Sequence, residues 1–156
     1  MSQRNYEVLI YGSYGYTGKL IADECKRRGL RVLLSGRNET LLETQSLALN
    51  YDYQVFSMDQ TDRILNALSQ CQLVIHCGGP FILTAKRMIE ACIKSGTHYL
   101  DITGEYGVFQ LAHSYNQSAR DAGIMLMSGT GFDVVPTDCI AVYLKNLLPS
   151  ATGLQL

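Results

Sequence analysis

Three glycines that follow the first apolar segment constrain this chain more than any other feature. Val8–Tyr11 is apolar, β-branched and aromatic, which predicts a short buried strand. Gly12, Gly15 and Gly18 follow at G-x-x-G-x-x-G spacing, and a helix is expected over Lys19–Arg28. Gly12 allows a sharp exit from the strand, Gly15 lets a ligand approach the backbone, and Gly18 lets the helix pack close to the strand. The segment therefore predicts a strand, a tight turn and a helix N-terminus.

This arrangement is typical of a dinucleotide-binding turn. The first N–H groups of the helix would face a pyrophosphate, and the helix dipole would favour its negative charge. The expected contacts are Gly12, Ser13, Tyr14, Gly15, Tyr16, Thr17 and Gly18. The alternative is a glycine-rich turn that binds nothing.

The rest of the chain repeats one unit: a short apolar strand, a loop, an amphipathic helix and often a glycine. Further strands are expected over 31–35, 53–57, 73–77, 98–102 and 124–127. Helices are expected over 39–49, 62–69, around 85–93, from after 105 to 122, and over 136–148. In the first helix we expect Leu20, Ile21 and Cys25 to face inward. Strands without polar alternation are buried on both faces, which predicts an α/β fold with a doubly wound, mostly parallel sheet, strand order 3-2-1-4-5-6 and helices on both faces.

Composition limits the class of protein. The 156 residues fit one dinucleotide-binding domain over 1–149, and 150–156 are expected to begin a second domain that is missing. A net charge of −1 argues against a nucleic-acid surface, and no apolar run is long enough to predict a membrane span. The five cysteines form no Cys-x-x-Cys pair and no signal peptide precedes the first strand, so reduced, mostly buried thiols in a cytoplasmic protein are expected. The three histidines show no metal-site spacing, so no metal is expected.

The loop after the second predicted strand bears on the choice between NAD and NADP. It reads Ser35-Gly36-Arg37-Asn38, with no acid before Glu39 to hold a ribose 2′-hydroxyl. Arg37 can pair with a 2′-phosphate and stack on adenine, while Ser35 and Asn38 can donate hydrogen bonds. NADP is therefore favoured over NAD, although Arg37 could instead be a solvated residue at a helix start. Asp59 could accept from the adenine amino group or cap a turn.

The fourth predicted strand ends in His76-Cys77-Gly78-Gly79-Pro80, and residues 77–80 complete the predicted cofactor contacts. His76 lies in an apolar run, which favours a hydrogen-bonded core histidine over an acid–base group. Cys77 has no evident paired base. The carboxylates expected nearest the site are Asp101, Glu105, Asp133 and Asp138. Asp101 and Glu105 could face a nicotinamide or cap backbone turns, so the catalytic residues stay unknown.

Several longer phrases together resemble the N-terminal part of the saccharopine dehydrogenase-like oxidoreductases. They are the glycine turn, Ser35–Asn38, Gly79-Pro80-Phe81, the phrase G-T-H-Y-L-D-I-T-G-E over 96–105, and G-F-D-V-V-P-T-D over 131–138. The likeness spans nearly the whole chain and is greater to the enoyl-reductase-like branch than to the lysine-pathway enzymes.

This resemblance implies a two-domain NAD(P)-dependent oxidoreductase whose Rossmann domain carries the cofactor. Hydride would pass to an imine, carbonyl or enoyl substrate that stays unidentified, and the present chain would be inactive without its second domain. The alternative is a non-catalytic NADP(H)-sensing or regulatory module. A self-contained short-chain dehydrogenase is disfavoured, because no Tyr-x-x-x-Lys pair occurs on a helix after the fourth predicted strand. The resemblance leaves a homodimer open.

Overall fold

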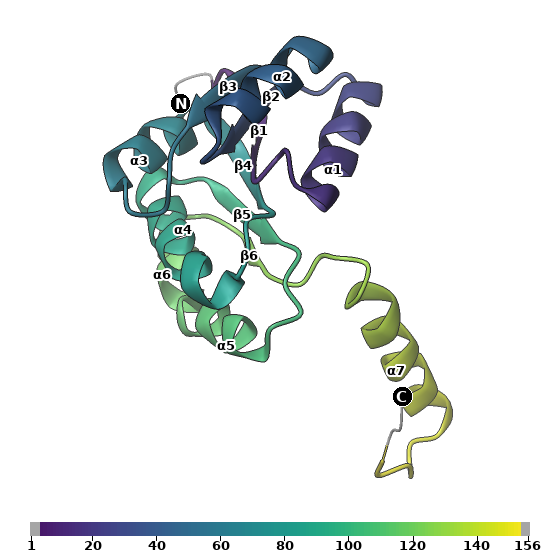
Figure 1. Ribbon diagram of the computed structural model, residues 1–156. Helices are drawn as coiled ribbons and strands as arrows, with labels where there is room; N and C mark the ends of the chain where they lie inside the picture. The colour runs from purple at the N-terminus through teal and green to yellow at the C-terminus, as the bar shows by residue number, and fades with distance from the viewer. Residues whose placement is uncertain (1–3, 154–156) are drawn as a thin grey trace.

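The computed structural model describes residues 4–153, and their centre is one parallel sheet of six strands (Figure 1). The strands are β1 (Tyr6–Tyr11), β2 (Val32–Gly36), β3 (Asp52–Val55), β4 (Cys71–His76), β5 (His98–Asp101) and β6 (Leu126–Met127). They lie in the order β3-β2-β1-β4-β5-β6, and every neighbouring pair is parallel. The predicted doubly wound sheet is therefore confirmed. The strand order reverses between β1 and β4, because β2 and β3 lie on one side of β1, whereas β4, β5 and β6 lie on the other.

Helices cover both faces of the sheet. They are α1 (Tyr16–Arg27), α2 (Glu39–Leu49), α3 (Thr61–Ser69), α4 (Phe81–Ser95), α5 (Tyr106–Ser114), α6 (Asn116–Asp121) and α7 (Val135–Leu147). Val8 and Ile10 of β1 pack with Ala22 of α1 and Leu42 of α2 on one face. The side chains that alternate with them face α3, α4 and α5. Both faces of β1 are thus buried, as its unbroken apolar sequence predicts.

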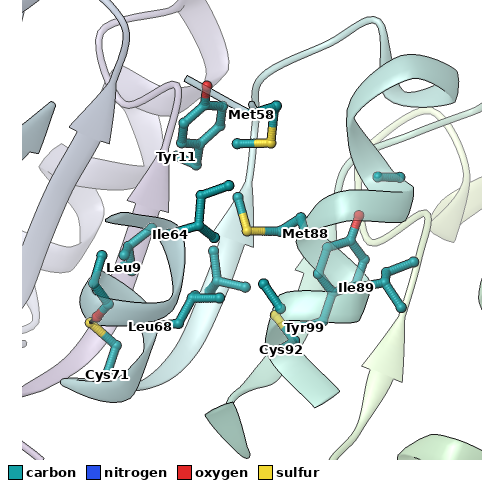
Figure 2. Packing of buried hydrophobic residues seen from close by; sticks show 14 of the residues in the cluster. Leu9, Tyr11, Met58, Ile64, Leu68, Cys71, Met88, Ile89, Cys92 and Tyr99 are labelled. Atoms are coloured by element: carbon teal, nitrogen blue, oxygen red, sulfur yellow. Dashed lines mark hydrogen bonds between the residues drawn. The ribbon is translucent and has the colours of Figure 1, made fainter. Parts of the chain in front are cut away.

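The larger core lies between the sheet and α3 and α4 (Figure 2). Leu9 of β1, Leu68 of α3 and Met88 of α4 are fully buried there, and Tyr99 of β5 closes the cluster. Each large apolar side chain buried in this way contributes about 1.5–3 kcal/mol to folding. This core holds the carboxyl ends of β1 and β4 in a fixed relation.

The inner face of α1 differs from the expectation. Leu20 is 55% exposed, while Gly18, Ala22 and Cys25 are buried. These three residues are small and recur at spacings of four and three, so they form a narrow stripe on which the helix approaches the sheet closely. Helix α1 also begins at Tyr16, three residues earlier than expected, which makes Tyr16, Thr17 and Gly18 its first turn.

The single helix expected between residues 105 and 122 is broken at Tyr115. Tyr115 has φ −90° and ψ 4°, outside the helical range, and separates α5 from α6. Its hydroxyl donates to Glu90 Oε1 of α4 at 2.6 Å. The tyrosine therefore anchors this segment to α4, a tertiary contact that overrides local helix propensity.

Helix α7 contains no buried residue and extends away from the sheet (Figure 1). Residues 151–153 after it form neither helix nor strand, and residues 154–156 of the expected second domain lie outside the described part of the chain. Within residues 4–153, no helix is long and apolar enough to cross a membrane.

Candidate functional site

A cleft of about 540 Å³ lies at the carboxyl ends of the strands, beside the point where the strand order reverses. Nine of the fifteen predicted cofactor contacts line it: Gly12, Tyr14, Gly15, Arg37, Asp59, Cys77, Gly78, Gly79 and Pro80. These residues come from the loops after β1, β2, β3 and β4. In parallel sheets this edge is where ligands bind, because the loops from both sides of the reversal leave a crevice there.

The three glycines of the first turn differ in whether, and why, a side chain could not be accommodated at that position. Gly12 has φ +79°, a conformation that residues with a side chain rarely adopt. At Gly18 an added Cβ would lie 2.2 Å from the carbonyl oxygen of Gly12, so only hydrogen fits between α1 and the turn. Gly15 has an ordinary φ of −68°, and an added Cβ would meet only the Gly12 oxygen, at 3.2 Å. The backbone conformation of Gly15 therefore does not require glycine, and a Cβ there would meet one close contact, the Gly12 oxygen, while Gly15 itself lines the cleft.

Helices α1 and α4, which follow the neighbouring strands β1 and β4, differ in what their N-termini offer. Helix α1 has no side-chain cap and no acid in its first turn, so its first amides are available to an anion. In α4, the amides of Phe81 and Ile82 donate to the carboxylate of Glu105 at 2.9 and 2.7 Å. This confirms the capping interpretation of Glu105 and leaves α1 as the uncapped terminus of the two.

At the end of β2, the structure corrects the expected role of Ser35. Its side chain is fully buried and its hydroxyl donates to the carbonyl of Gln54 on β3 at 2.8 Å, so it does not face the cleft. Asn38 caps α2, because its side-chain oxygen accepts from the amide of Leu41 at 3.1 Å, and it does not line the cleft either. Arg37 is the residue of this loop whose charge remains exposed at the cleft.

Four residues of the glycine turn also stand outside the cleft lining: Ser13, Tyr16, Thr17 and Gly18. Ser13 is fully buried, and its hydroxyl has no hydrogen-bond partner within the described residues. Tyr16 is 85% exposed. Any contact of Tyr16, Thr17 or Gly18 with a ligand would have to come from the first turn of α1 rather than from the cleft wall.

Sequence reasoning missed seven cleft residues: Tyr11, Gly36, Ser57, Met58, Leu83, Thr84 and Arg87. Leu83, Thr84 and Arg87 lie on one face of α4, at spacings of one and three residues. Arg87 brings a second positive charge to the cleft. Ser57 donates to Asp59, which lowers the pKa of that carboxyl below its ordinary value, and the charge of Arg87 adds to the effect.

His76 is a core residue, as expected, rather than an acid–base group. Its ring is fully buried, and burial lowers its pKa to about 3, so the imidazole is neutral at physiological pH. Its Nε2 lies 2.9 Å from the hydroxyl of Thr84, which also lies within hydrogen-bond distance of the carbonyls of Gly78 and Pro80. The pair thus supports the loop after β4, with Thr84 itself in the cleft lining.

Apart from Cys77, which lines the cleft, the other candidate groups are either buried within the fold or located outside the cleft. Burial raises the pKa of Cys77 to about 12, so the thiol stays protonated. Asp101 is fully buried and accepts from the Tyr99 hydroxyl at 2.7 Å and the Gly129 amide at 2.8 Å. Asp133 and Asp138 are exposed near the start of α7 and do not line the cleft. Three of the five cysteines, Cys25, Cys71 and Cys92, are buried, whereas Cys77 is half-buried and Cys139 on α7 is exposed. Residues 4–153 contain no group of histidines, cysteines and carboxylates that could hold a metal ion.

A second hollow, of about 710 Å³, lies at the opposite edge of the sheet, beside Tyr6, Leu30, Arg31, Asn50 and Asp52. The C-terminus of α2 lies beside this hollow, and the carbonyls at that end of the helix carry partial negative charge. It contains no glycine turn and no helix N-terminus. Its larger volume therefore does not make it the better candidate for a phosphate-bearing ligand.

Comparison with known proteins identifies the family of this chain. Residues 8–127 match the family model described as the saccharopine dehydrogenase NADP binding domain. Saccharopine dehydrogenase-like oxidoreductase of Mus musculus is 24% identical over 164 residues, covering 92% of this chain and 38% of that protein. Trans-acting enoyl reductase of Mycobacterium bovis is 29% identical over 145 residues, covering 88% of this chain and 35% of that protein. The chain thus spans little more than a third of these relatives.

Among solved structures, apo saccharopine dehydrogenase (L-Glu forming) of Saccharomyces cerevisiae has the same fold, with a TM-score of 0.79 at 16% identity. The alignment covers 94% of this chain and 32% of the yeast chain. The family model covers most of the chain, from β1 to the end of β6. The chain therefore belongs to the family of saccharopine dehydrogenase NADP-binding domains.

Proposed function

We propose that this chain binds NADP(H) in the cleft and serves as the cofactor domain of an oxidoreductase that transfers hydride to an imine, a carbonyl or an activated alkene. The observation that carries the proposal is the absence of a side chain at Gly15, which lines the cleft next to the uncapped N-terminus of α1. A pyrophosphate needs both: close access to the backbone, and N–H groups whose partial charge favours an anion.

The charges around the cleft support NADP over NAD. Arg37 and Arg87 line the cleft, and no acid follows β2 before Glu39, which lies in the first turn of α2. A guanidinium pairs strongly with a phosphate, whereas an enzyme that prefers NAD usually places an acid here for the ribose 2′-hydroxyl. In the proposed complex Arg37 holds the 2′-phosphate, and Asp59 lies near the adenine.

The nicotinamide ring supplies the hydride once the cofactor is bound. The contribution of this chain is to orient the dinucleotide and to shield one side of it from water. Near neutral pH, buried His76 is a neutral imidazole with no extra proton to give, and burial makes the Cys77 thiol too weak an acid to donate its proton readily. Substrate and proton-donating groups are therefore expected from the remainder of a protein of the length of the relatives.

The test is a titration of the chain with NADPH and NADH, followed by cofactor fluorescence. NADPH should bind more tightly than NADH. Gly15→Val should abolish binding of both while leaving the circular dichroism spectrum unchanged, because φ at Gly15 suits a residue with a side chain. Gly104→Ala is the matched control, since an added Cβ there meets nothing within 4 Å. Undiminished affinity in Gly15→Val would show that the phosphates lie elsewhere.

A non-catalytic NADP(H)-sensing module would give the same titration. NADPH oxidation separates the two functions, measured on a protein of the relatives' full length with imines, carbonyls and enoyl thioesters. Turnover with one of these classes supports the oxidoreductase. The chain of 156 residues, assayed alongside, should bind cofactor without turnover.

A further inference from the structure

We propose that the hydroxyl of Tyr14 reads the 2′ position of the cofactor and, together with Arg37, sets the preference for NADP over NAD. This inference rests on the proposed function, since it assumes that the adenosine half of the dinucleotide lies at the end of β2. It assigns to one residue of the glycine turn a task that such turns ordinarily leave to the β2 loop.

The ring of Tyr14 lies directly against the backbone where β2 ends. An added Cβ at Gly36 would lie 2.5 Å from Cε1 of Tyr14, so the ring packs on Gly36 at a distance that only glycine permits. Tyr14 and Gly36 both line the cleft. The aromatic ring therefore forms the cleft wall above the β2 exit.

The Tyr14 oxygen accepts two hydrogen bonds from this loop. The amide of Arg37 donates to it at 3.0 Å and the amide of Asn38 at 3.2 Å. Backbone N–H groups at this position would otherwise be free to hold a ligand on the adenosine ribose. Here the tyrosine occupies both.

A phenol oxygen has two lone pairs and one proton. Because the two amides use both lone pairs, the O–H of Tyr14 must point away from the loop. Within residues 4–153 this O–H has no protein acceptor, and the residue borders the cleft. The two amides are thus already bonded to Tyr14, and the donor that remains for a ligand in the cleft is the Tyr14 hydroxyl.

The guanidinium of Arg37 borders the cleft from the same loop. Together the two residues present a neutral donor and a positive charge to whatever lies at the 2′ position. A dianionic phosphate gains more from this pair than a ribose hydroxyl does, since hydrogen bonds to charged groups are stronger than those between neutral groups. The other polar side chains of the loop do not compete, because Ser35 is bonded to β3 and Asn38 caps α2.

The experiment compares Tyr14→Phe with the parent chain by titration with NADPH and NADH. Phenylalanine keeps the ring on Gly36 and removes only the hydroxyl. We expect the Kd for NADPH to rise about tenfold or more and that for NADH to rise about threefold or less. Tyr53→Phe is the matched control: Tyr53 lies on β3, outside the cleft lining, and should leave both constants unchanged.

Each other result overturns the inference in a recognisable way. An equal change for both cofactors, or none, means that Tyr14 does not read the 2′ position. Tighter NADPH binding by Tyr14→Phe means that the hydroxyl competes with the phosphate for the two amides. A parent chain that binds neither cofactor refutes the proposed function itself.

A second measurement keeps the inference testable if Tyr14→Phe does not fold. In the parent chain, the assigned ring resonances of Tyr14 should shift on saturation with adenosine 2′,5′-bisphosphate and stay in place with adenosine 5′-monophosphate. Equal shifts with the two nucleotides would contradict a contact between Tyr14 and the 2′-phosphate.

Discussion

Replacing Gly18 by alanine should destabilise the fold, although alanine is the better helix former. The added Cβ would lie 2.2 Å from the carbonyl oxygen of Gly12 and 2.8 Å from Cα of Ser13. Both are backbone atoms, so no side chain can rotate away to make room. Helix α1 would have to move outward from the turn.

The magnitude follows from two opposing effects. Overpacking costs typically 1–3 kcal/mol, and a clash with backbone belongs at or above the top of that range. Alanine offsets about 1 kcal/mol of this through its helix propensity. We therefore expect a net loss of about 2 kcal/mol in the free energy of unfolding, which for a domain of this size lowers Tm by about 4–8 °C.

The assay is thermal unfolding followed by circular dichroism, with urea unfolding as a second measure of the free energy. Gly104→Ala is again the control for a glycine whose Cβ would meet open space, and it should change stability by less than about 0.5 kcal/mol. A Gly18→Ala variant as stable as the parent would show that α1 does not pack against the Gly12 carbonyl, and the reasoning about the turn would be refuted.

Two further predictions concern Arg37 and His76. Arg37→Ala should weaken NADPH binding by about 1.5–3 kcal/mol and reduce the preference over NADH, measured by titration with both cofactors; a variant that keeps its preference would contradict the assigned role. Because burial lowers the pKa of His76 from 6.5 to about 3, the unfolded chain binds a proton in this interval that the folded chain does not. The stability that His76 contributes is therefore present above pH 6.5 and is lost as the pH falls toward 3, by about 1.4 kcal/mol per pH unit. The stability difference between the parent and His76→Phe should shrink between pH 7 and pH 5 in urea unfolding, and a difference independent of pH would argue against a buried neutral imidazole.

The sheet could be predicted because the sequences of its central strands themselves indicate burial on both faces. An unbroken apolar run such as that of β1 requires burial on both faces, and right-handed crossovers then leave few possible strand orders. The inner face of α1 was not predictable in the same way. Leu20 has the hydrophobicity of a core residue, but the close approach at Gly18 selects small side chains such as Ala22 instead.

Residues of the candidate site could be predicted where they belong to a recognisable local motif in a loop. Gly12, Gly15 and Arg37 could be assigned because local motifs identify them. Arg87 could not, because on the sequence it is one more charged residue of an amphipathic helix, and only the crossover from β4 brings it to the cleft. The buried position of the Ser35 side chain could not be predicted for a related reason. Its hydrogen bond to Gln54 depends on the pairing of β2 with β3, which no local pattern indicates.

The two hydrogen bonds that the first amides of α4 donate to Glu105 bear on the direction in which a dinucleotide would lie. Helices α1 and α4 follow β1 and β4, the two neighbouring strands beside the cleft, and two uncapped termini there would give the diphosphate two anchoring points and the ligand two registers. Since Glu105 already accepts from the first amides of α4, α1 is the uncapped terminus of these two helices. In the proposed complex, Arg37 on the β2 side of α1 would favour a phosphorylated ribose at that end, and the nicotinamide would lie toward β4 and β5. By capping α4, Glu105 would thus favour one direction of the cofactor in that complex.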